Sequence, residues 1–441
     1  MHNTSPWAWV PSLYFAEGLP YMMIMVVSGI MYKDLGVSNT DLALYTSLLY
    51  LPWVIKPFWS PLVDLFRTNQ FWIVSMQILL GLSLAGVAFA IPTSNPLRYT
   101  LIFFWIAAFS SATHDIAADG FYMIALREDQ QSFFVGFRSF FYRVAMWFAQ
   151  GALVIAAGML GQLYGAAAYG WSIAFGISGL IMLALGIFHL FLLPKKSKDE
   201  KTLYQDKIDA IGDTGPSAAT KSSPQPQGFI ERLFDLIVTF FMKKQAILAL
   251  LFILFYRFSE AQLGKMAQPF MLDPADAGGL GLDVTTVGFI YGTVGLVGLV
   301  LGGLLGGFLI SRDGLKKWLW PMVIAINIPN IIYIYLAMAQ PDNTYLLMAA
   351  VAVEQFGYGF GFTAFMMYLI YISQGSYKTA HYAFATGLMA LGMMLPGAIS
   401  GLVQEQLGYT NFFIWIMIAT IPAFIITAFL KIDPAFGKRT A

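Results

Sequence analysis

Apolar runs of more than about 18 residues recur along the whole chain, separated by short polar segments. An α-helix of about 20 apolar residues crosses the hydrocarbon core of a bilayer, and barrel strands would instead show apolar and polar residues in alternation. The pattern therefore predicts an all-α membrane protein with twelve spans, at residues 11–32, 41–64, 71–91, 98–122, 133–160, 168–193, 245–270, 284–310, 318–339, 344–372, 379–406 and 411–430.

A polar stretch divides these spans into two sets of six. Residues 195–244 are rich in Lys, Asp, Ser and Pro, a composition typical of a linker. We expect two pseudo-symmetric six-helix bundles, at residues 1–194 and 245–441, joined by a cytoplasmic linker at 195–244. Near the end of the linker, residues 229–241 place apolar side chains at helical spacing opposite charged ones, which predicts an amphipathic helix on the membrane surface.

Composition narrows the class of protein. Apolar residues make up 58% of the chain and charged residues 11%, against about 25% charged residues in soluble domains, which excludes a soluble globular protein. The chain has no Cys, so a disulfide scaffold and a thiolate metal site are also excluded. We expect no metal and no other cofactor, and the net charge of +1 gives no indication of a nucleic-acid partner.

The distribution of positive charge predicts the orientation. If both termini and the linker share one side, nineteen of the 25 Lys and Arg residues fall on that side, and only Lys33 and Arg98 fall on the other. Cytoplasmic segments carry such an excess. Both termini are therefore predicted to be cytoplasmic.

Two loops at equivalent places in the halves resemble each other. The loop after the second span reads SPLVDLFRTNQFW, with Asp64 and Arg67, and the loop after the eighth reads GGFLISRDGLKKW. Parallel repeats have this property. We interpret Asp64 and Arg67 as a cytoplasmic gating latch that holds the outward-open state. The alternative is that these charges only anchor the loops on the inside.

Ionisable residues inside the spans are candidates for function, because a charge at bilayer depth is costly. Glu17 lies beside Gly18 and Pro20, which interrupt the first helix, so it is predicted to contact substrate or a proton. Lys56 follows Trp53 in a proline-rich second span and requires an anion or a carboxylate partner. The structural alternative is a pair between Glu17 and Lys56.

The fourth and fifth spans carry a second group of candidates. Asp115 and Asp119 are four residues apart and share a helix face, where mutual repulsion favours uptake of a proton. His114 precedes them and titrates near neutral pH in water. Arg143 suits a carboxylate or phosphate ligand. A helix-to-helix ion pair of the aspartates with Arg143 and Lys56 is the alternative.

The second half offers fewer candidates. Arg257 and Glu260 stand at i, i+3 and are expected to pair within one helix. Glu354 has no local partner and is a candidate for proton or substrate contact. His381 and Glu405 lie near span ends, where we expect them at the interface.

Four segments resemble one family. The layout of two six-span halves resembles the major facilitator superfamily. Within it, KPFWSPLVD (56–64), THDIAADG (113–120), FYR (141–143) and EGLP (17–20) resemble signatures of AmpG-type muropeptide permeases, in the peptide, acetyl-CoA and drug transporter group. His114 and Glu17 depart from the family pattern. The resemblance is concentrated in residues 14–150.

The resemblance implies a proton-driven importer of cell-wall fragments in the bacterial inner membrane, with Lys56, Asp64, Asp115, Asp119 and Arg143 at its functional positions. The departures leave open another oligosaccharide or amino sugar. The expected partners are a small sugar, peptide or anionic substrate, protons and the lipid bilayer, and the chain is expected to be a monomer.

The candidate residues then fall into three predicted roles. Substrate binding is assigned to Glu17, Lys56, Trp53, Tyr14, Arg143 and Glu354; proton coupling to Asp115, Asp119 and His114; and gating to Asp64 and Arg67.

Other classes of function compete with this prediction. A drug or metabolite efflux carrier of the same superfamily is the main alternative. A membrane acyltransferase is a remote one, since the H-x4-D spacing of His114 and Asp119 is a weak signal. A membrane sensor is equally remote. No Walker-type phosphate-binding motif is present, so direct use of ATP is not expected.

Overall fold

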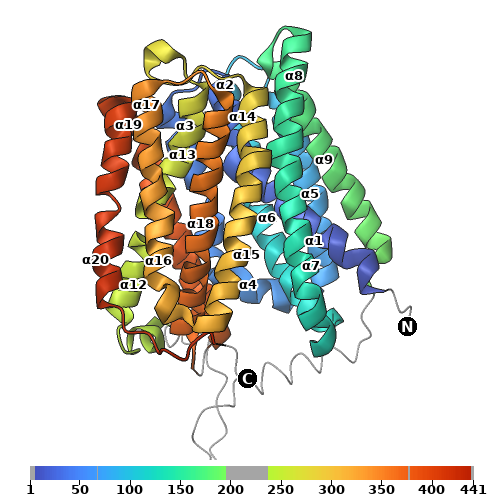
Figure 1. Ribbon diagram of the computed structural model, residues 1–441. Coiled ribbons are helices and arrows are strands. Elements are labelled where there is room, and N and C mark those ends of the chain that lie inside the picture. The colour runs from blue at the N-terminus through green and yellow to red at the C-terminus, as the bar shows by residue number, and fades with distance from the viewer. Residues whose placement is uncertain (1–4, 67, 195–236, 376–377, 439–441) are drawn as a thin grey trace, which may run out of the picture.

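The structure is a computed structural model that describes residues 5–66, 68–194, 237–375 and 378–438. Every regular element within these residues is helical, and the helices stand side by side as one upright bundle (Figure 1). Most of the expected linker, the first part of the expected amphipathic helix and Arg67 lie outside the described residues.

The N-terminal half contains six spans, several of them built from more than one helical segment. Their elements are α1 (Pro6–Met22), η1 (Met23–Val27), α2 (Ser28–Asp34), α3 (Asn39–Leu48), α4 (Leu51–Phe66), α5 (Asn69–Ala90), α6 (Pro96–Ala125), α7 (Glu128–Met146), η2 (Trp147–Leu153), α8 (Val154–Tyr164) and α9 (Ala167–Leu192).

The C-terminal half is built in the same way. Its elements are α12 (Ala246–Phe255), α13 (Phe258–Leu272), η3 (Ala275–Ala277), α14 (Val284–Phe289), η4 (Ile290–Gly295), α15 (Leu296–Asp313), α16 (Leu315–Asn327), η5 (Ile328–Asn330), α17 (Ile331–Ala339), α18 (Thr344–Ser373), α19 (Lys378–Ile418) and α20 (Ile421–Phe429).

The prediction of twelve spans is confirmed. Ten helical stretches of the described residues are long and apolar enough to cross a membrane. One of them, His381–Phe429, is two spans, because Gly408 adopts a left-handed backbone (φ 72°) and turns the chain. The pair α3 and α4, interrupted at Leu49 and Tyr50, supplies the remaining span.

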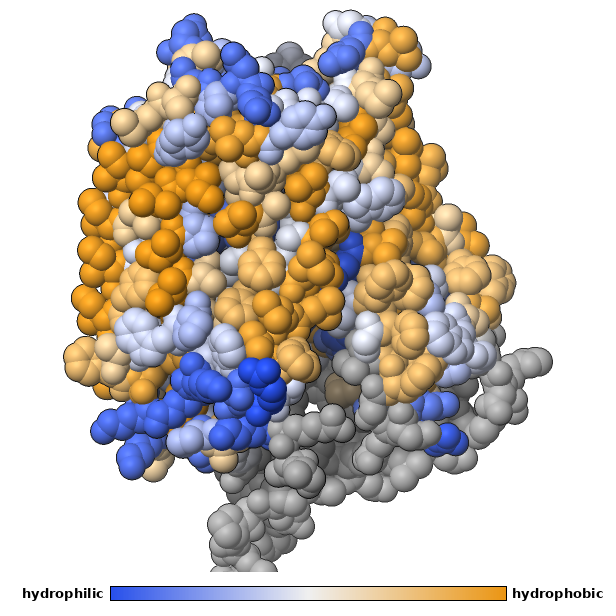
Figure 2. Space-filling view, viewed as in Figure 1, coloured by the Kyte–Doolittle hydropathy of each residue, from blue (hydrophilic) through white to orange (hydrophobic). Residues whose placement is uncertain are grey.

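The outer surface of the bundle suits a bilayer. Large apolar side chains such as Phe89, Leu163 and Phe191 are exposed. Figure 2 shows a broad hydrophobic surface over the middle of the bundle, with hydrophilic residues gathered toward its two ends. The same view shows an indented seam in which hydrophilic residues are visible at depth. Lipid accounts for the exposed apolar surface, which water would not tolerate at this extent.

The two halves meet in close backbone contact at the end opposite the described chain ends, where α3, α8 and α14 lie (Figure 1). Small residues make this approach possible. A Cβ placed on Gly401 would lie 1.8 Å from the backbone oxygen of Asn39, and one on Gly292 would lie 2.3 Å from the nitrogen of Gly151. Larger residues at these glycines would therefore hold the halves apart.

Several spans are interrupted along their length. The elements η1, η2 and η4 are π-helical turns inside longer helices. Between α12 and α13, Arg257 leaves helical geometry (φ −112°, ψ 18°). Such interruptions are enriched at functional sites and free backbone groups to face a cavity.

Candidate functional site

Lys56 and Asp115 form an ion pair between the second and fourth spans. Lys56 Nζ on α4 lies 3.2 Å from Asp115 Oδ2 on α6, and Trp53 Nε1 donates to the same oxygen at 3.2 Å. One turn separates Trp53 from Lys56, so a single helix face carries both donors. The structure thus brings together three of the predicted site residues.

Asp119 has a different partner from the one that the sequence suggested. Arg138 Nη2 on α7 lies 2.7 Å from Asp119 Oδ1, and the Arg138 guanidinium stands 4.6 Å from the ring centre of Tyr14 on α1. Sequence analysis counted Arg138 among the nineteen cytoplasmic charges and named Arg143 and Lys56 only as alternative partners of the aspartates. Arg138 lay inside the predicted span at 133–160, which was the available signal for its role.

Glu17 completes a group that we call the central cluster: Glu17, Lys56, Asp115, Asp119 and Arg138. Glu17 is buried, and its Oε2 has no hydrogen-bond partner among the described residues. It lies within electrostatic range of the other four groups, yet the ion pair with Lys56, which was the structural alternative, is not formed among the described residues. Three carboxylates therefore share two cations, so the cluster can accept one more positive charge, such as a proton.

His114 faces away from the aspartates into the N-terminal half. Its Nε2 lies 3.0 Å from Gln77 Nε2 on α5, and Gln77 Oε1 lies 2.9 Å from His189 Nδ1 on α9. Ser12 on α1 continues the chain with a 2.9 Å contact to His189 Nε2. This buried network joins four helices. The sequence carried no signal for it, because its members are far apart along the chain.

Arg143 reaches toward the opposite half. Its Nη2 lies 3.7 Å from the point that a Cβ on Gly303 of α15 would occupy. No carboxylate of the described residues forms an ion pair with it, so the alternative of a pair with Asp115 or Asp119 is not realised in this structure.

Within the spans of the C-terminal half, Glu354 and Glu260 form no ion pair among the described residues. Gln355 Nε2 donates to Glu354 Oε2 at 3.0 Å, and Tyr333 donates to the same oxygen at 3.4 Å. The Nη2 of Arg257 donates to the Tyr358 hydroxyl, and no ion pair between Arg257 and Glu260 is formed within the described residues. The expected pair within one helix is absent because the helix is interrupted at Arg257.

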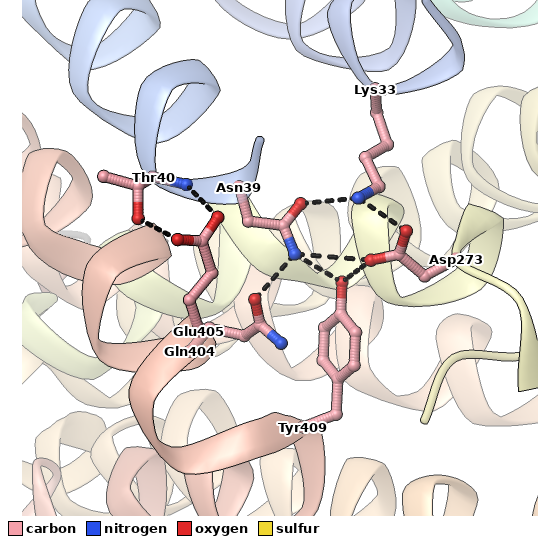
Figure 3. Close-up of polar contacts among 7 residues, drawn as sticks. All are labelled: Lys33, Asn39, Thr40, Asp273, Gln404, Glu405 and Tyr409. Carbon is pink, nitrogen blue, oxygen red and sulfur yellow. Dashed lines mark hydrogen bonds and ion pairs between the residues drawn. The ribbon is translucent and has the colours of Figure 1, made fainter. Parts of the chain in front are cut away.

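A second polar group joins the halves at the end opposite the described chain ends. We call it the outer lock; Figure 3 shows its seven residues, Lys33, Asn39, Thr40, Asp273, Gln404, Glu405 and Tyr409. Lys33 Nζ lies 2.5 Å from Asp273 Oδ1, and Tyr409 donates to Asp273 Oδ2 at 2.6 Å. These bonds connect the end of α2 with the end of α13 and with α19.

Asn39 and Thr40 extend the outer lock along α3. Asn39 Nδ2 donates to Gln404 Oε1 at 2.6 Å and to the Tyr409 hydroxyl at 2.9 Å, and Thr40 Oγ1 donates to Glu405 Oε2 at 2.6 Å (Figure 3). Sequence analysis expected Glu405 near a span end, at the interface, and did not identify Thr40 as its partner. The predicted latch of Asp64 and Arg67 stays a prediction, because Arg67 and the side chain of Asp64 lie outside the described residues.

Comparison with known proteins identifies the architecture. The family model described as Major Facilitator Superfamily matches residues 12–264. The crystal structure of a D-xylose-proton symporter superposes with a TM-score of 0.70 at 12% identity, covering 98% of this chain and 99% of that chain. The nucleoside transporter NupG gives a TM-score of 0.66 at 17% identity, over 98% and 100%. These two structures show the fold alone.

Curated relatives extend over nearly the whole chain. "Putative transporter AmpG 4" of Rickettsia conorii is 26% identical and covers 95% of each chain. "Anhydromuropeptide permease" of Escherichia coli K12 is 26% identical, over 97% of this chain and 82% of the relative. The family and these relatives indicate a transporter of small molecules rather than an enzyme. The chain is a multi-pass secondary transporter that resembles the AmpG-type permeases, and it belongs to the major facilitator superfamily.

Proposed function

We propose that this protein is a proton-coupled importer in the bacterial inner membrane. Its substrate is a muropeptide derived from the cell wall, or a related anionic amino-sugar oligosaccharide. The observation that carries the proposal is the central cluster, in which three carboxylates and two cations lie among spans of an otherwise apolar bundle. A relative named for anhydromuropeptide transport gives the substrate class.

Proton coupling is supported by the charge balance of the central cluster. Lys56 and Arg138 pair with Asp115 and Asp119, which leaves Glu17 without a cation. A buried carboxylate without a counter-ion favours its protonated form. We assign the transported proton to the set of Glu17, Asp115 and Asp119. The His114 ring bonds to Gln77 and not to these carboxylates. His114 therefore influences the set only indirectly, through the position of Asp115, the next residue.

Recognition of an amino sugar is supported by the aromatic residues beside the cluster. Trp53 and Tyr21 form an edge-to-face pair with ring centres 5.4 Å apart, and Tyr14 lies under Arg138. Aromatic side chains offer apolar faces to sugar rings, and Lys56 and Arg143 offer charge to a carboxylate. Glu354 remains our candidate for a contact from the second half.

The state of the structure follows if the positively charged end is cytoplasmic. The outer lock then lies at the periplasmic side, and its closure corresponds to a state that opens inward. Substrate would bind near mid-depth while one half rocks against the other. We retain Asp64 and Arg67 as the proposed latch for the opposite, outward-open state.

Uptake into proteoliposomes tests the proposal. Purified protein would be reconstituted, and accumulation of radiolabelled N-acetylglucosaminyl-1,6-anhydro-N-acetylmuramic acid measured with and without an imposed inward pH gradient. We expect saturable uptake that a protonophore abolishes. Dependence on a sodium gradient with indifference to the protonophore would reject proton coupling. Saturable exchange of apolar drugs without muropeptide uptake would favour the efflux alternative.

A further inference from the structure

Arg257 is buried at an interruption in the seventh span. The helix α12 ends at Phe255 and α13 begins at Phe258, so Arg257 sits at the junction as the residue before the first turn of α13. Only 7% of its surface is exposed. Membrane carriers place their substrate sites at such broken helices, where backbone and side-chain groups face a cavity.

The guanidinium is held on one side by aromatic residues. Its carbon lies 4.8 Å from the ring centre of Phe362 and 5.2 Å from that of Tyr358, and the two rings are nearly parallel (17°). Tyr358 accepts a hydrogen bond from Nη2. This arrangement fixes the plane of the guanidinium and stabilises its charge by cation–π contact, without neutralising it.

No counter-ion completes the site. Among the described residues no carboxylate forms an ion pair with Arg257, and its Nε has no hydrogen-bond partner. Glu260, one turn further, is within electrostatic range, but its Oε2 is also unpartnered. A buried guanidinium with an unpartnered Nε and no counter-ion among the described residues is costly, so the arrangement favours an incoming anion. The planar donors match a carboxylate in a bidentate way.

The opposite half presents rings to the same region. Tyr50, at the interruption between α3 and α4, lies within electrostatic range of Arg257 and neighbours Tyr21. Lys265 from α13 places its ammonium 5.6 Å from the ring centre of Tyr50. The interruptions of the second and seventh spans thus lie within electrostatic range of each other. One contributes an aromatic ring, and the other contributes a cation that forms no ion pair among the described residues.

We propose that Arg257, supported by Tyr358 and Phe362, is the subsite of the second half that binds the carboxylate of the substrate, while Tyr50 packs against an adjoining ring. The ligand class is a carboxylate joined to a sugar or to a short peptide. This inference rests on the proposed function and deepens it. It adds a specificity-determining residue that is separate from the central cluster.

Matched pairs of ligands test the subsite. One pair is N-acetylglucosaminyl-1,6-anhydro-N-acetylmuramic acid and its methyl amide, which differ at the carboxylate; the other is D-Ala–D-Ala and its amide. Binding to purified wild type, Arg257→Gln, Arg257→Lys and Tyr358→Phe would be measured by calorimetry and by thermal shift. Arg98→Gln is the control, because it makes the same change at an exposed position.

For the ligand pair that wild type binds more tightly, we expect Arg257→Gln to weaken binding of the acid at least tenfold and binding of the amide less than threefold. Arg257→Lys should recover part of the difference, and Arg98→Gln should change neither. Equal weakening of acid and amide, or full retention of both, would overturn the subsite. A loss of thermal stability in Arg257→Gln that Glu260→Gln reproduces would assign Arg257 to a structural pair.

Failure of the proposed function gives a separate result. If wild type binds the dipeptide acid through Arg257 but neither binds nor accumulates the muropeptide, the substrate proposal fails and the subsite stands. If wild type accumulates the muropeptide and Arg257→Gln does not distinguish acid from amide, the proposed function stands and the subsite fails. If wild type binds neither acid more tightly than its amide, the subsite proposal is overturned.

Discussion

The outer lock and the central cluster are both polar groups in an apolar bundle, but they differ in how completely they are satisfied. In the outer lock, Asp273 accepts bonds from Lys33, Asn39 and Tyr409, and Glu405 accepts from Thr40. In the central cluster Glu17 keeps an unpartnered oxygen. A satisfied network stabilises one arrangement of the chain, whereas an unsatisfied network changes with a proton or a ligand.

Their position relative to the two halves differs as well. The outer lock joins one half to the other, through bonds from Lys33, Asn39 and Thr40 to residues of the C-terminal half. The lock must therefore break whenever the outer end of the bundle opens. The ion pairs of the central cluster join spans of the N-terminal half only, so opening of the outer end does not by itself break them. The comparison predicts that mutations in the lock change the population of states, and mutations in the cluster change binding and coupling.

The largest effect is expected from wedging the halves apart. Gly401→Ala places a Cβ 1.8 Å from the backbone oxygen of Asn39, which α3 and α19 cannot accommodate without separating. We expect uptake to be lost while the protein still folds and inserts. Gly307→Ala is the control, since nothing lies within 4 Å of its Cβ position.

Labelling reports the wedge directly. The chain has no Cys, so a single Ser47→Cys, placed between the halves beside Gly397, gives an unambiguous site for a membrane-impermeant maleimide. Labelling from the lock side should rise strongly in Gly401→Ala and stay low in Gly307→Ala. Normal uptake by Gly401→Ala would contradict the assignment of this contact as the closed gate.

The next largest effect is expected in the central cluster. Lys56→Gln removes the cation that faces Asp115, and loss of a charged hydrogen bond costs about 1.5–3 kcal/mol. Because the lost partner is Asp115 rather than the carboxylate assigned to Arg257, uptake of the muropeptide and of its methyl amide should both fall, roughly 10–150-fold. The double variant Lys56→Gln with Asp115→Asn removes both charges of the pair. If it recovers thermal stability but not uptake, the pair has a role in transport beyond holding the two helices together.

A smaller effect is expected from the outer lock itself. Lys33→Gln removes one charged bond to Asp273. Because both side chains are slightly exposed, we expect the closed state of the lock to lose about 1 kcal/mol of stability, which is a several-fold shift toward the outward-open state. Labelling of Ser47→Cys should rise modestly, and the swap of Lys33 to Asp with Asp273 to Lys should reverse part of it. A change in substrate affinity with unchanged labelling would place Lys33 in binding instead.

The fold was readable from the sequence because span length and charge asymmetry are local signals. The central cluster was readable in part: Lys56, Asp115, Asp119 and Glu17 stand out as charges in apolar runs. The partner of Asp119 could not be predicted, because Arg138 lies near the start of its span and was counted with the cytoplasmic charges.

Contacts between the halves were beyond the reach of sequence patterns. The outer lock joins Asn39 to Gln404 and Tyr409, residues separated by more than half of the chain. Pairing at such a distance depends on how the two bundles meet, and no periodicity along a single helix records it. The π-helical turns and the interruption at Arg257 were hidden for the same reason, since tertiary packing fixes them.

The smallest effect is expected at Trp53, where the ring and the N–H have separate tasks. Trp53→Phe keeps an aromatic face beside Tyr21 but removes the donor to Asp115 Oδ2. Because Lys56 still holds that oxygen, the loss should be near 1 kcal/mol, a few-fold decrease in muropeptide affinity that is similar for acid and amide. Trp53→Leu, which also removes the ring, should weaken both ligands further. If Trp53→Phe were as damaging as Lys56→Gln, the indole rather than the ammonium would be the main partner of Asp115.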